Sequence, residues 1–313
     1  AGDAGVEGDG GLPPGIVECS HEWKDEAGDV VSVSRTYAQE MENYANWFAY
    51  YRTRIQAVKT ATSLVFKELD SKFRVGFHTL ANNPTSDFAN VDYFDPAQKT
   101  TWFQKLFGIY IKTGRETPNL DAVVRVGEWY ATGGHPQLAA ASDPIVPTLT
   151  CQKNWHMLFT DGITNQPAIP TTVVGNVDLT IPVLPEDLSV KGLIPGNLWP
   201  TQFRENATSV SNSLADYVTH YWARDFKPAM TNNVPGSDRD PASWQHGNFA
   251  AMSLGTEGKL PTGNQSATED QIKAGTAAWS QTIPTVYKPD ASGVDDLWHA
   301  AINGRGRFVN AQS

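Results

Sequence analysis

Residues 151–162 read Cys-Gln-Lys-Asn-Trp-His-Met-Leu-Phe-Thr-Asp-Gly, and this stretch decides the fold class. Its central residues, 155–159, form a short and nearly continuous apolar run. Such a run is typical of a strand that is buried on both faces of a parallel sheet. A polar Thr-Asp-Gly turn follows at the point where the strand should end. The stretch therefore predicts an α/β protein built on parallel strands.

Helices and strands are predicted to alternate on both sides of this strand. Apolar residues recur at spacings of three and four from Glu40 to near Asp70, which indicates one long amphipathic helix with a core-facing aromatic stripe. Thr117 and Pro118 are typical of a helix N-cap and first helical residue. Three further helices are predicted: one that begins at Pro96, one over 214–222 and one from Asp295 to 302. Strands are predicted over 73–79, 248–254 and 307–310. This alternation predicts an α/β layered fold.

The composition excludes several classes of protein. The 313 residues include 24 Lys and Arg against 34 Asp and Glu, and the resulting net charge of −10 argues against a nucleic-acid partner. No run approaches the roughly 18 apolar residues of a membrane span. Two cysteines are too few for a Cys-rich zinc site. Because the sequence has no initiator Met and no signal-like segment, we treat it as a fragment of a longer chain.

The chain is predicted to divide into two parts. Residues 1–40 begin with a Gly/Asp/Pro-rich stretch and are expected to be flexible or irregular, whereas residues 41–313 form the α/β domain. Two polar stretches show no helical or strand-like hydrophobic period. They lie at about 163–210 and 256–290 and are expected to be long loop insertions. Long loops in compact domains are often functional, so these are the expected contacts with a surface or another subunit.

No motif supports catalysis. The chain has no His-Glu-x-x-His spacing, no Gly-x-Ser-x-Gly elbow and no phosphate-binding loop. Four histidines are expected to be core or edge residues with satisfied nitrogens, and four acids are expected to be loop or N-cap residues. These are His78, His156, His246 and His299, and Asp238, Asp240, Asp295 and Asp296. An uncharacterised secreted hydrolase is a remote alternative for which no residue is nominated.

Four stretches together resemble the amino-terminal region of the PilY/PilC family of type IV pilus tip-associated adhesins and biogenesis factors. They read NYANWFAYYRTR at 43–54, CQKNWHMLFTDG at 151–162, AMTNNVP at 229–235 leading to DPASWQH at 240–246, and DDLWHAAINGRGR at 295–307. They follow the order of the family over most of the chain. The resemblance implies a von Willebrand factor A-like domain, with a doubly wound, mostly parallel central sheet flanked by helices.

The resemblance also implies a divalent cation at the carboxyl end of the sheet. Mg²⁺ and Ca²⁺ prefer carboxylate, hydroxyl and water oxygens. Thr117 matches the family's loop Thr, although it could simply cap a helix, and Asp161 matches the Asp after the buried strand, although it could be a turn residue. The family's Asp-x-Ser-x-Ser motif is missing. Its strand either lies upstream, which we favour, or is replaced by residues 16–20, with Glu18 and Ser20 as substitutes.

The implied setting is a secreted one. In a secreted protein Cys19 and Cys151 would form a disulfide, whereas in the cytosol they would be unrelated thiols. The resemblance implies a non-enzymatic protein that is exported through the periplasm to the pilus tip at the cell surface. There it would support pilus biogenesis, twitching motility and adhesion to a host or abiotic surface receptor. The alternative, favoured by the missing motif, is a structural module that docks onto minor pilins and has no working cation site.

Overall fold

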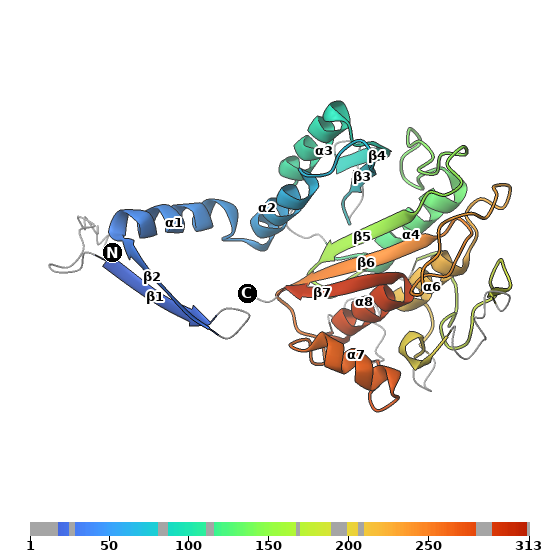
Figure 1. Ribbon diagram of the computed structural model, residues 1–313. Helices are drawn as coiled ribbons and strands as arrows, with labels where there is room; N and C mark the ends of the chain where they lie inside the picture. The colour runs from blue at the N-terminus through green and yellow to red at the C-terminus, as the bar shows by residue number, and fades with distance from the viewer. Residues whose placement is uncertain are drawn as a thin grey trace, which may run out of the picture. The chain divides into compact units, whose positions relative to one another are not determined.

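The computed structural model describes residues 18–24, 29–80, 87–110, 116–166, 170–188, 199–205, 210–279 and 290–311. They belong to two compact units, residues 1–66 and 67–313 (Figure 1). The boundary between these units falls after residue 66, and the division expected after residue 40 stays a prediction. No helix in the described part of the chain is long and apolar enough to cross a membrane.

The first unit contains a hairpin followed by two helices. β1 (Glu18–Lys24) pairs antiparallel with β2 (Val30–Thr36), and α1 (Tyr37–Tyr50) and α2 (Arg54–Phe66) follow. The described part of the segment expected to be irregular is therefore a regular hairpin. The idea that residues 16–20 replace the missing strand is wrong for the residues described, because β1 pairs with β2 and not with the parallel sheet.

The long aromatic helix predicted from residue 40 to 70 is interrupted. α1 ends at Tyr50 and α2 begins at Arg54. No residue of α1 is buried, and Trp47 of the expected core-facing stripe is 49% exposed. The expectation of a core-facing stripe is therefore wrong for α1. Helical periodicity places apolar side chains on one face, but it does not specify what covers that face.

The second unit begins with a small antiparallel layer. β3 (Arg74–His78) pairs with β4 (Phe88–Tyr93), and α3 (Pro96–Gly108) packs on both strands. The side chain of Asp95 caps α3 by accepting a hydrogen bond from the amide of Gln98 (2.8 Å). The indole of Trp102 donates to the carbonyl of Gly76 in β3 (3.0 Å) and holds the helix on the sheet. The strand predicted at 73–79 is confirmed, but it belongs to this separate sheet.

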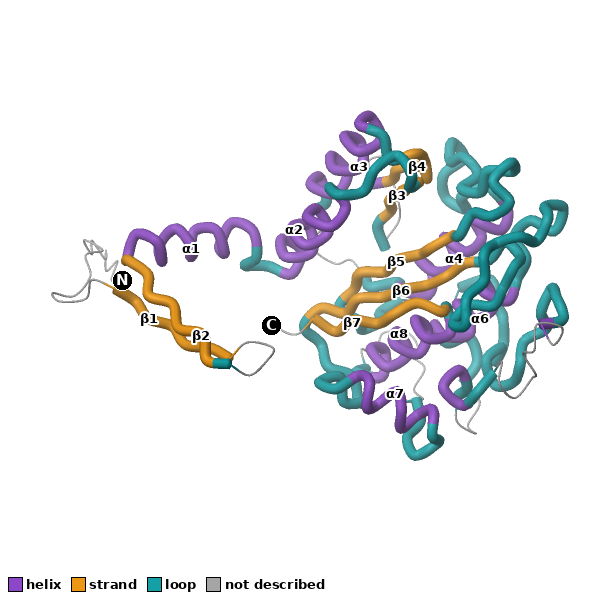
Figure 2. The backbone as a smooth tube through the Cα atoms, viewed as in Figure 1, coloured by secondary structure: helices purple, strands orange, loops and turns teal. Residues whose placement is uncertain are grey.

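A three-stranded parallel sheet forms the centre of the second unit (Figure 2). Its strands lie in the order β5 (Asn154–Thr160), β6 (Gly247–Leu254) and β7 (Arg305–Ala311). α4 (Asn119–Thr132) contacts β5, and α6 (Leu214–Ala223) and α8 (Ser292–Asn303) contact β6 and each other. The predicted α/β class with parallel strands is therefore confirmed.

The two faces of this sheet differ in burial. Leu158 of β5 and Phe308 of β7 are buried in the same core cluster as the residues of α6 and α8. The residues that alternate with them are open to solvent, with Trp155 46% and Met157 52% exposed. Burial of β5 on both faces is therefore wrong. A continuous apolar run indicates a strand, but it does not show that both faces are covered.

The two predicted loop insertions contain regular secondary structure and residues of the core. In the first, Trp199 is fully buried and a 3₁₀ turn, η3, spans Thr201–Phe203. The second contains a helix, α7 (Gln265–Lys273), whose N-terminus is capped by Asn264 accepting from the amide of Ala267 (3.1 Å). Ile272 of α7 is buried in the main core. The sequence pattern of these segments is typical of loops because polar side chains outnumber the few apolar residues that anchor them.

Candidate functional site

The loop before α4 and the loop after β5 meet at the carboxyl end of β5, and we call this region the crest. The carbonyl of Thr117 accepts a hydrogen bond from the amide of Asn165 (3.0 Å), which forms an isolated bridge between the loops. The side-chain amide of Asn119 donates to the hydroxyl of Thr164 (3.2 Å). The structure therefore brings the two segments that carry Thr117 and Asp161 together.

Asp161 is half-buried in a tight turn. One carboxylate oxygen, Oδ1, accepts from the amide of Ile163 (3.2 Å) and from the hydroxyl of Thr160 (3.4 Å). Gly162 follows with a φ of 86°, and a Cβ atom there would lie 2.7 Å from the hydroxyl oxygen of Ser253. Only glycine fits this turn without strain.

The start of α4 differs from the prediction by one residue. Pro118 occupies the N-cap position and makes no side-chain cap hydrogen bond, so the expected Thr117 cap is wrong. The first turn is satisfied from the neighbouring loop, because the amide of Leu120 donates to the side-chain oxygen of Gln166 (3.2 Å). The Thr117 hydroxyl is therefore not required for capping.

The crest fits a Mg²⁺ or Ca²⁺ ion only in part. Asp161 and Thr117 supply one carboxylate and one hydroxyl, whereas these cations take six or more oxygen ligands. Among the described residues, Asp161 is not part of a cluster of three or more acidic, His or Cys side chains. A complete coordination shell therefore needs water, further protein oxygens or a carboxylate from a bound partner.

The predicted disulfide is not visible in the described residues. Cys151 is exposed and has no disulfide partner among the described residues. Cys19 lies in β1 of the other unit, and its side chain is outside the described residues. The pairing therefore stays a prediction.

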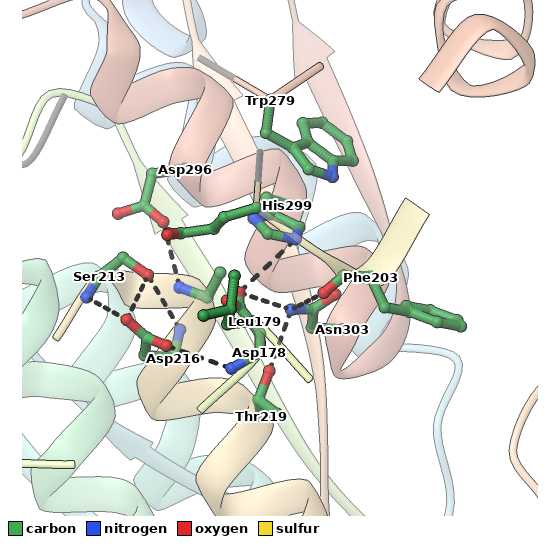
Figure 3. Close-up of polar contacts among 12 residues, drawn as sticks. Asp178, Leu179, Phe203, Ser213, Asp216, Thr219, Trp279, Asp296, His299 and Asn303 are labelled. Atoms are coloured by element: carbon green, nitrogen blue, oxygen red, sulfur yellow. Dashed lines mark hydrogen bonds and ion pairs between the residues drawn. The ribbon is translucent and has the colours of Figure 1, made fainter. Parts of the chain in front are cut away.

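A second group of polar side chains lies inside the helical layer (Figure 3), and we call it the buried acid cluster. Its centre is Asp178, Glu205 and His299, whose potential ligand atoms all lie within 4.8 Å of one another. Asp178 and Glu205 come from the predicted loop insertion, and His299 comes from α8. His299 Nε2 lies 3.7 Å from Asp178 Oδ2, which also accepts from the Asn303 amide (3.2 Å).

Two further acids connect the buried acid cluster to the start of α6. The carboxylate of Asp296 accepts from the amides of Leu214 (2.9 Å) and Ala215 (3.1 Å), the first two residues of that helix. Asp216 forms a capping box with Ser213 and also accepts from the amide of Val177 (2.6 Å). These interactions are favourable because a helix N-terminus carries a partial positive charge.

The expectation that Asp295 and Asp296 cap α8 is wrong. The helix begins at Ser292, so both acids lie inside it. Asp295 instead accepts from the amides of Lys259 (3.0 Å) and Leu260 (3.2 Å) in the loop after β6. Each acid therefore joins α8 to a segment distant in sequence.

Burial shifts the pKa values of the side chains in the buried acid cluster. Burial, followed by the negative charges of Asp216, Glu205 and Asp296, raises the pKa of Asp178 to about 10. Burial, followed by the charges of Asp216 and Asp296, raises the pKa of Glu205 to about 8. Burial, followed by the charges of Asp216 and Asp295, raises the pKa of Asp296 to about 7. Burial lowers the pKa of His299 to about 3, so its imidazole is neutral at pH 7. Close carboxylates in a dry interior hold protons or recruit a cation.

Sequence reasoning missed most of the buried acid cluster. His299 is buried as expected, but its Nε2 has no hydrogen-bond partner among the described residues, so the expectation of satisfied nitrogens is wrong there. It is confirmed for His246, whose ring nitrogens contact the Trp244 carbonyl (2.7 Å) and Asp240 (3.0 Å). The available signal was the spacing of three between Asp296 and His299, which places both on one helical face.

Comparison with known proteins identifies relatives of this chain. It is similar to the type IV pilus biogenesis factor PilY1 of Pseudomonas aeruginosa, with 31% identity over 316 residues in strain PAK and 30% over 300 residues in strain UCBPP-PA14. The matches cover 88% and 87% of this chain, and the chain spans about a quarter of each relative, 25% and 24%. No family model and no solved structure matches, so the von Willebrand A-like fold stays a prediction. The homology confirms the resemblance to this family and supports membership of this chain in the PilY1-type family of type IV pilus biogenesis factors.

Proposed function

We propose that this chain is a non-enzymatic part of a type IV pilus biogenesis factor that binds surfaces in a cation-dependent manner. It is exported through the periplasm, lies at the pilus tip on the cell surface, and supports adhesion and twitching motility. The name of the P. aeruginosa relatives supports the biogenesis role. The bridge that joins the Thr117 loop to the Asp161 loop is the observation that supports the binding role.

The crest has the chemistry of an open cation site. Asp161 uses Oδ1 for hydrogen bonds within its own turn, so Oδ2 is the oxygen that we assign to Mg²⁺ or Ca²⁺. The Thr117 hydroxyl supplies a second oxygen from the neighbouring loop. A carboxylate of the bound receptor then completes the shell, which couples cation binding to receptor binding. Ligand sites at the carboxyl end of parallel strands are the general rule in such sheets.

The first test uses the isolated chain. Saturating Mg²⁺ or Ca²⁺ should raise its thermal unfolding midpoint relative to EDTA, because an ion that binds only the folded state stabilises it. The shift should vanish in Asp161→Ala and persist in Asp92→Ala, which removes an exposed acid on β4. Equal shifts in both variants would place the ion elsewhere.

The second test uses the full-length protein in piliated bacteria. Asp161→Ala should lower surface attachment at least tenfold while the number of surface pili stays unchanged, and Asp92→Ala should change neither. Attachment that survives Asp161→Ala would refute cation-dependent adhesion through the crest.

The second candidate is a structural module that docks onto minor pilins without a working cation site. It is favoured by the open face of the parallel sheet, where Met157 is 52% and Val309 46% exposed. An apolar surface of this kind is typical of protein contacts. This candidate predicts that Met157→Lys with Val309→Lys reduces the number of surface pili, whereas Asp161→Ala has no effect on pili or attachment.

A further inference from the structure

The buried acid cluster contains polar atoms without partners. Asp178 is fully buried and His299 is 2% exposed, yet Asp178 Oδ1 and His299 Nε2 have no hydrogen-bond partner among the described residues. The same holds for the side-chain oxygen of Asn303, which lies beside them (Figure 3). Buried polar atoms are almost always paired, so the unpaired atoms of Asp178 and His299 in one cluster indicate a missing ligand.

The donor chemistry of the cluster indicates the kind of ligand. Among the described residues, Asp178 lies 3.7 Å from the neutral ring of His299, and no Lys or Arg contributes to its interactions. Glu205 is 9% exposed and adds a second carboxyl group. Its Oε2 accepts from the amide of Val210 (3.2 Å). Two acids and a neutral imidazole in a dry interior form a site for a cation.

We propose that Asp178, Glu205 and His299 bind one divalent transition-metal ion of the Zn²⁺ or Mn²⁺ class. Imidazole nitrogen and carboxylate oxygen together suit these ions, whereas Mg²⁺ and Ca²⁺ prefer oxygen alone. No sulfur ligand belongs to the group. The ion is structural, because it joins the segments that carry Asp178 and Glu205 to α8. Its ligands are distinct from those of the crest, and the inference does not rest on the proposed adhesion.

The surrounding residues orient the ligand atoms. The carbonyl of Phe203 accepts a hydrogen bond from the His299 ring, which leaves Nε2 for the metal. The Asn303 amide donates to Asp178 Oδ2, which leaves Oδ1 for the metal. Such outer contacts are typical of metal sites. Atoms bound at about 2.1 Å are at most about 4.2 Å apart, so the observed limit of 4.8 Å requires only small side-chain movements.

The experiment compares variants of the whole chain. Asp178→Asn is the central one because it replaces the buried carboxyl group by an amide of nearly the same volume, so it should fold. His299→Gln is the second, and His220→Gln on α6 is the matched control, because His220 is half-buried and outside the group. Asp161→Ala separates this site from the crest.

The measurements are metal content and thermal unfolding. After dialysis against Zn²⁺ or Mn²⁺ and removal of free ion, wild type, His220→Gln and Asp161→Ala should retain one equivalent and show a raised unfolding midpoint. Asp178→Asn and His299→Gln should retain less than a tenth of an equivalent and show no shift. In the absence of metal, Asp178→Asn should unfold at the same temperature as wild type or higher. Wild-type protein that retains no ion, or folded variants that retain it, would overturn the proposal.

Discussion

Asp240 is predicted to be among the residues of the second unit whose substitution most lowers the free energy of unfolding. Its carboxylate is buried and accepts three side-chain hydrogen bonds, from Trp222 Nε1 (3.0 Å), His246 Nε2 (3.0 Å) and Asn248 Nδ2 (2.9 Å). Asp240→Ala leaves the indole of Trp222 and the ring of His246 buried without this acceptor, whereas the Asn248 amide keeps the carbonyl of Gly304 (3.3 Å). Each orphaned donor costs about 1–3 kcal/mol. Allowing for relaxation, we expect a loss of about 3–5 kcal/mol, the usual range for breaking a buried charged pair.

The same carboxylate gives a pH signature. Burial alone would raise the pKa of Asp240, but the hydrogen bonds and charge of His246, with the bonds from Trp222 and Asn248, hold it far below its ordinary value. An acid with a lowered folded-state pKa stabilises the protein fully above its unfolded pKa of about 3.9. This contribution is lost as the pH falls through the folded-state pKa. The difference in stability between wild type and Asp240→Asn should therefore shrink below about pH 4.

The assay is urea unfolding followed by tryptophan fluorescence, at pH 7 and at steps down to pH 3. Asp238→Ala is the matched control, because this acid is two residues away and exposed. It should change the free energy of unfolding by less than about 0.5 kcal/mol. A loss below about 1 kcal/mol in Asp240→Ala, or a wild-type to Asp240→Asn difference that grows with acidification, would refute this reasoning.

Three further substitutions test the parallel sheet and its core, each by urea unfolding. Gly306→Ala should cost about 1–3 kcal/mol because its Cβ would overlap a backbone carbonyl of β6, whereas Gly108→Ala, with open space around it, should be neutral or slightly stabilising. Arg305→Lys should lower the free energy of unfolding by about 1–2 kcal/mol. The buried guanidinium carbon lies 3.9 Å from the ring centroid of Phe203 and 4.0 Å from that of Trp222, and an ammonium group does not reproduce this stacking. Leu158→Ala should lower the free energy of unfolding by about 2–5 kcal/mol, whereas Met157→Ala should lower it by less than about 0.5 kcal/mol. Similar losses in both variants would contradict the one-sided burial of β5.

The sequence was most informative where local pattern and tertiary packing agree. The runs that became β5, β6 and β7, and the helical spacing over 214–222, predicted elements that the structure contains. Their apolar side chains alternate or recur with the periods of strands and helices. The same rule failed for α1, where Trp47 and its neighbours have a helical period but remain exposed. Periodicity reports the shape of an element, and burial depends on a partner that the pattern does not contain.

The candidate sites were only partly predictable, for a related reason. Asp161 could be nominated because the turn after an apolar strand is a local feature. The local sequence predicts loop and capping roles for Asp240 and Asp296, although their carboxylates bind groups distant in sequence. Asp178 and Glu205 lie in a stretch without any period, so nothing local distinguishes them from exposed acids. Their proximity to His299 arises only when the loop packs against α8.

The two proposed cation sites differ in their ligand atoms and burial, and this difference determines how an experiment with EDTA must be interpreted. The crest offers oxygen donors at the edge of the sheet, whereas the buried acid cluster includes the nitrogen of His299 and is enclosed by helices. EDTA binds the ions of both classes, so loss of attachment in EDTA does not by itself implicate the crest. If the buried ion holds the Asp178 segment against α8, its removal also loosens the α8 turn beside Gly162. Asp161→Ala and Asp178→Asn separate these effects, because only the first alters the crest without altering the core.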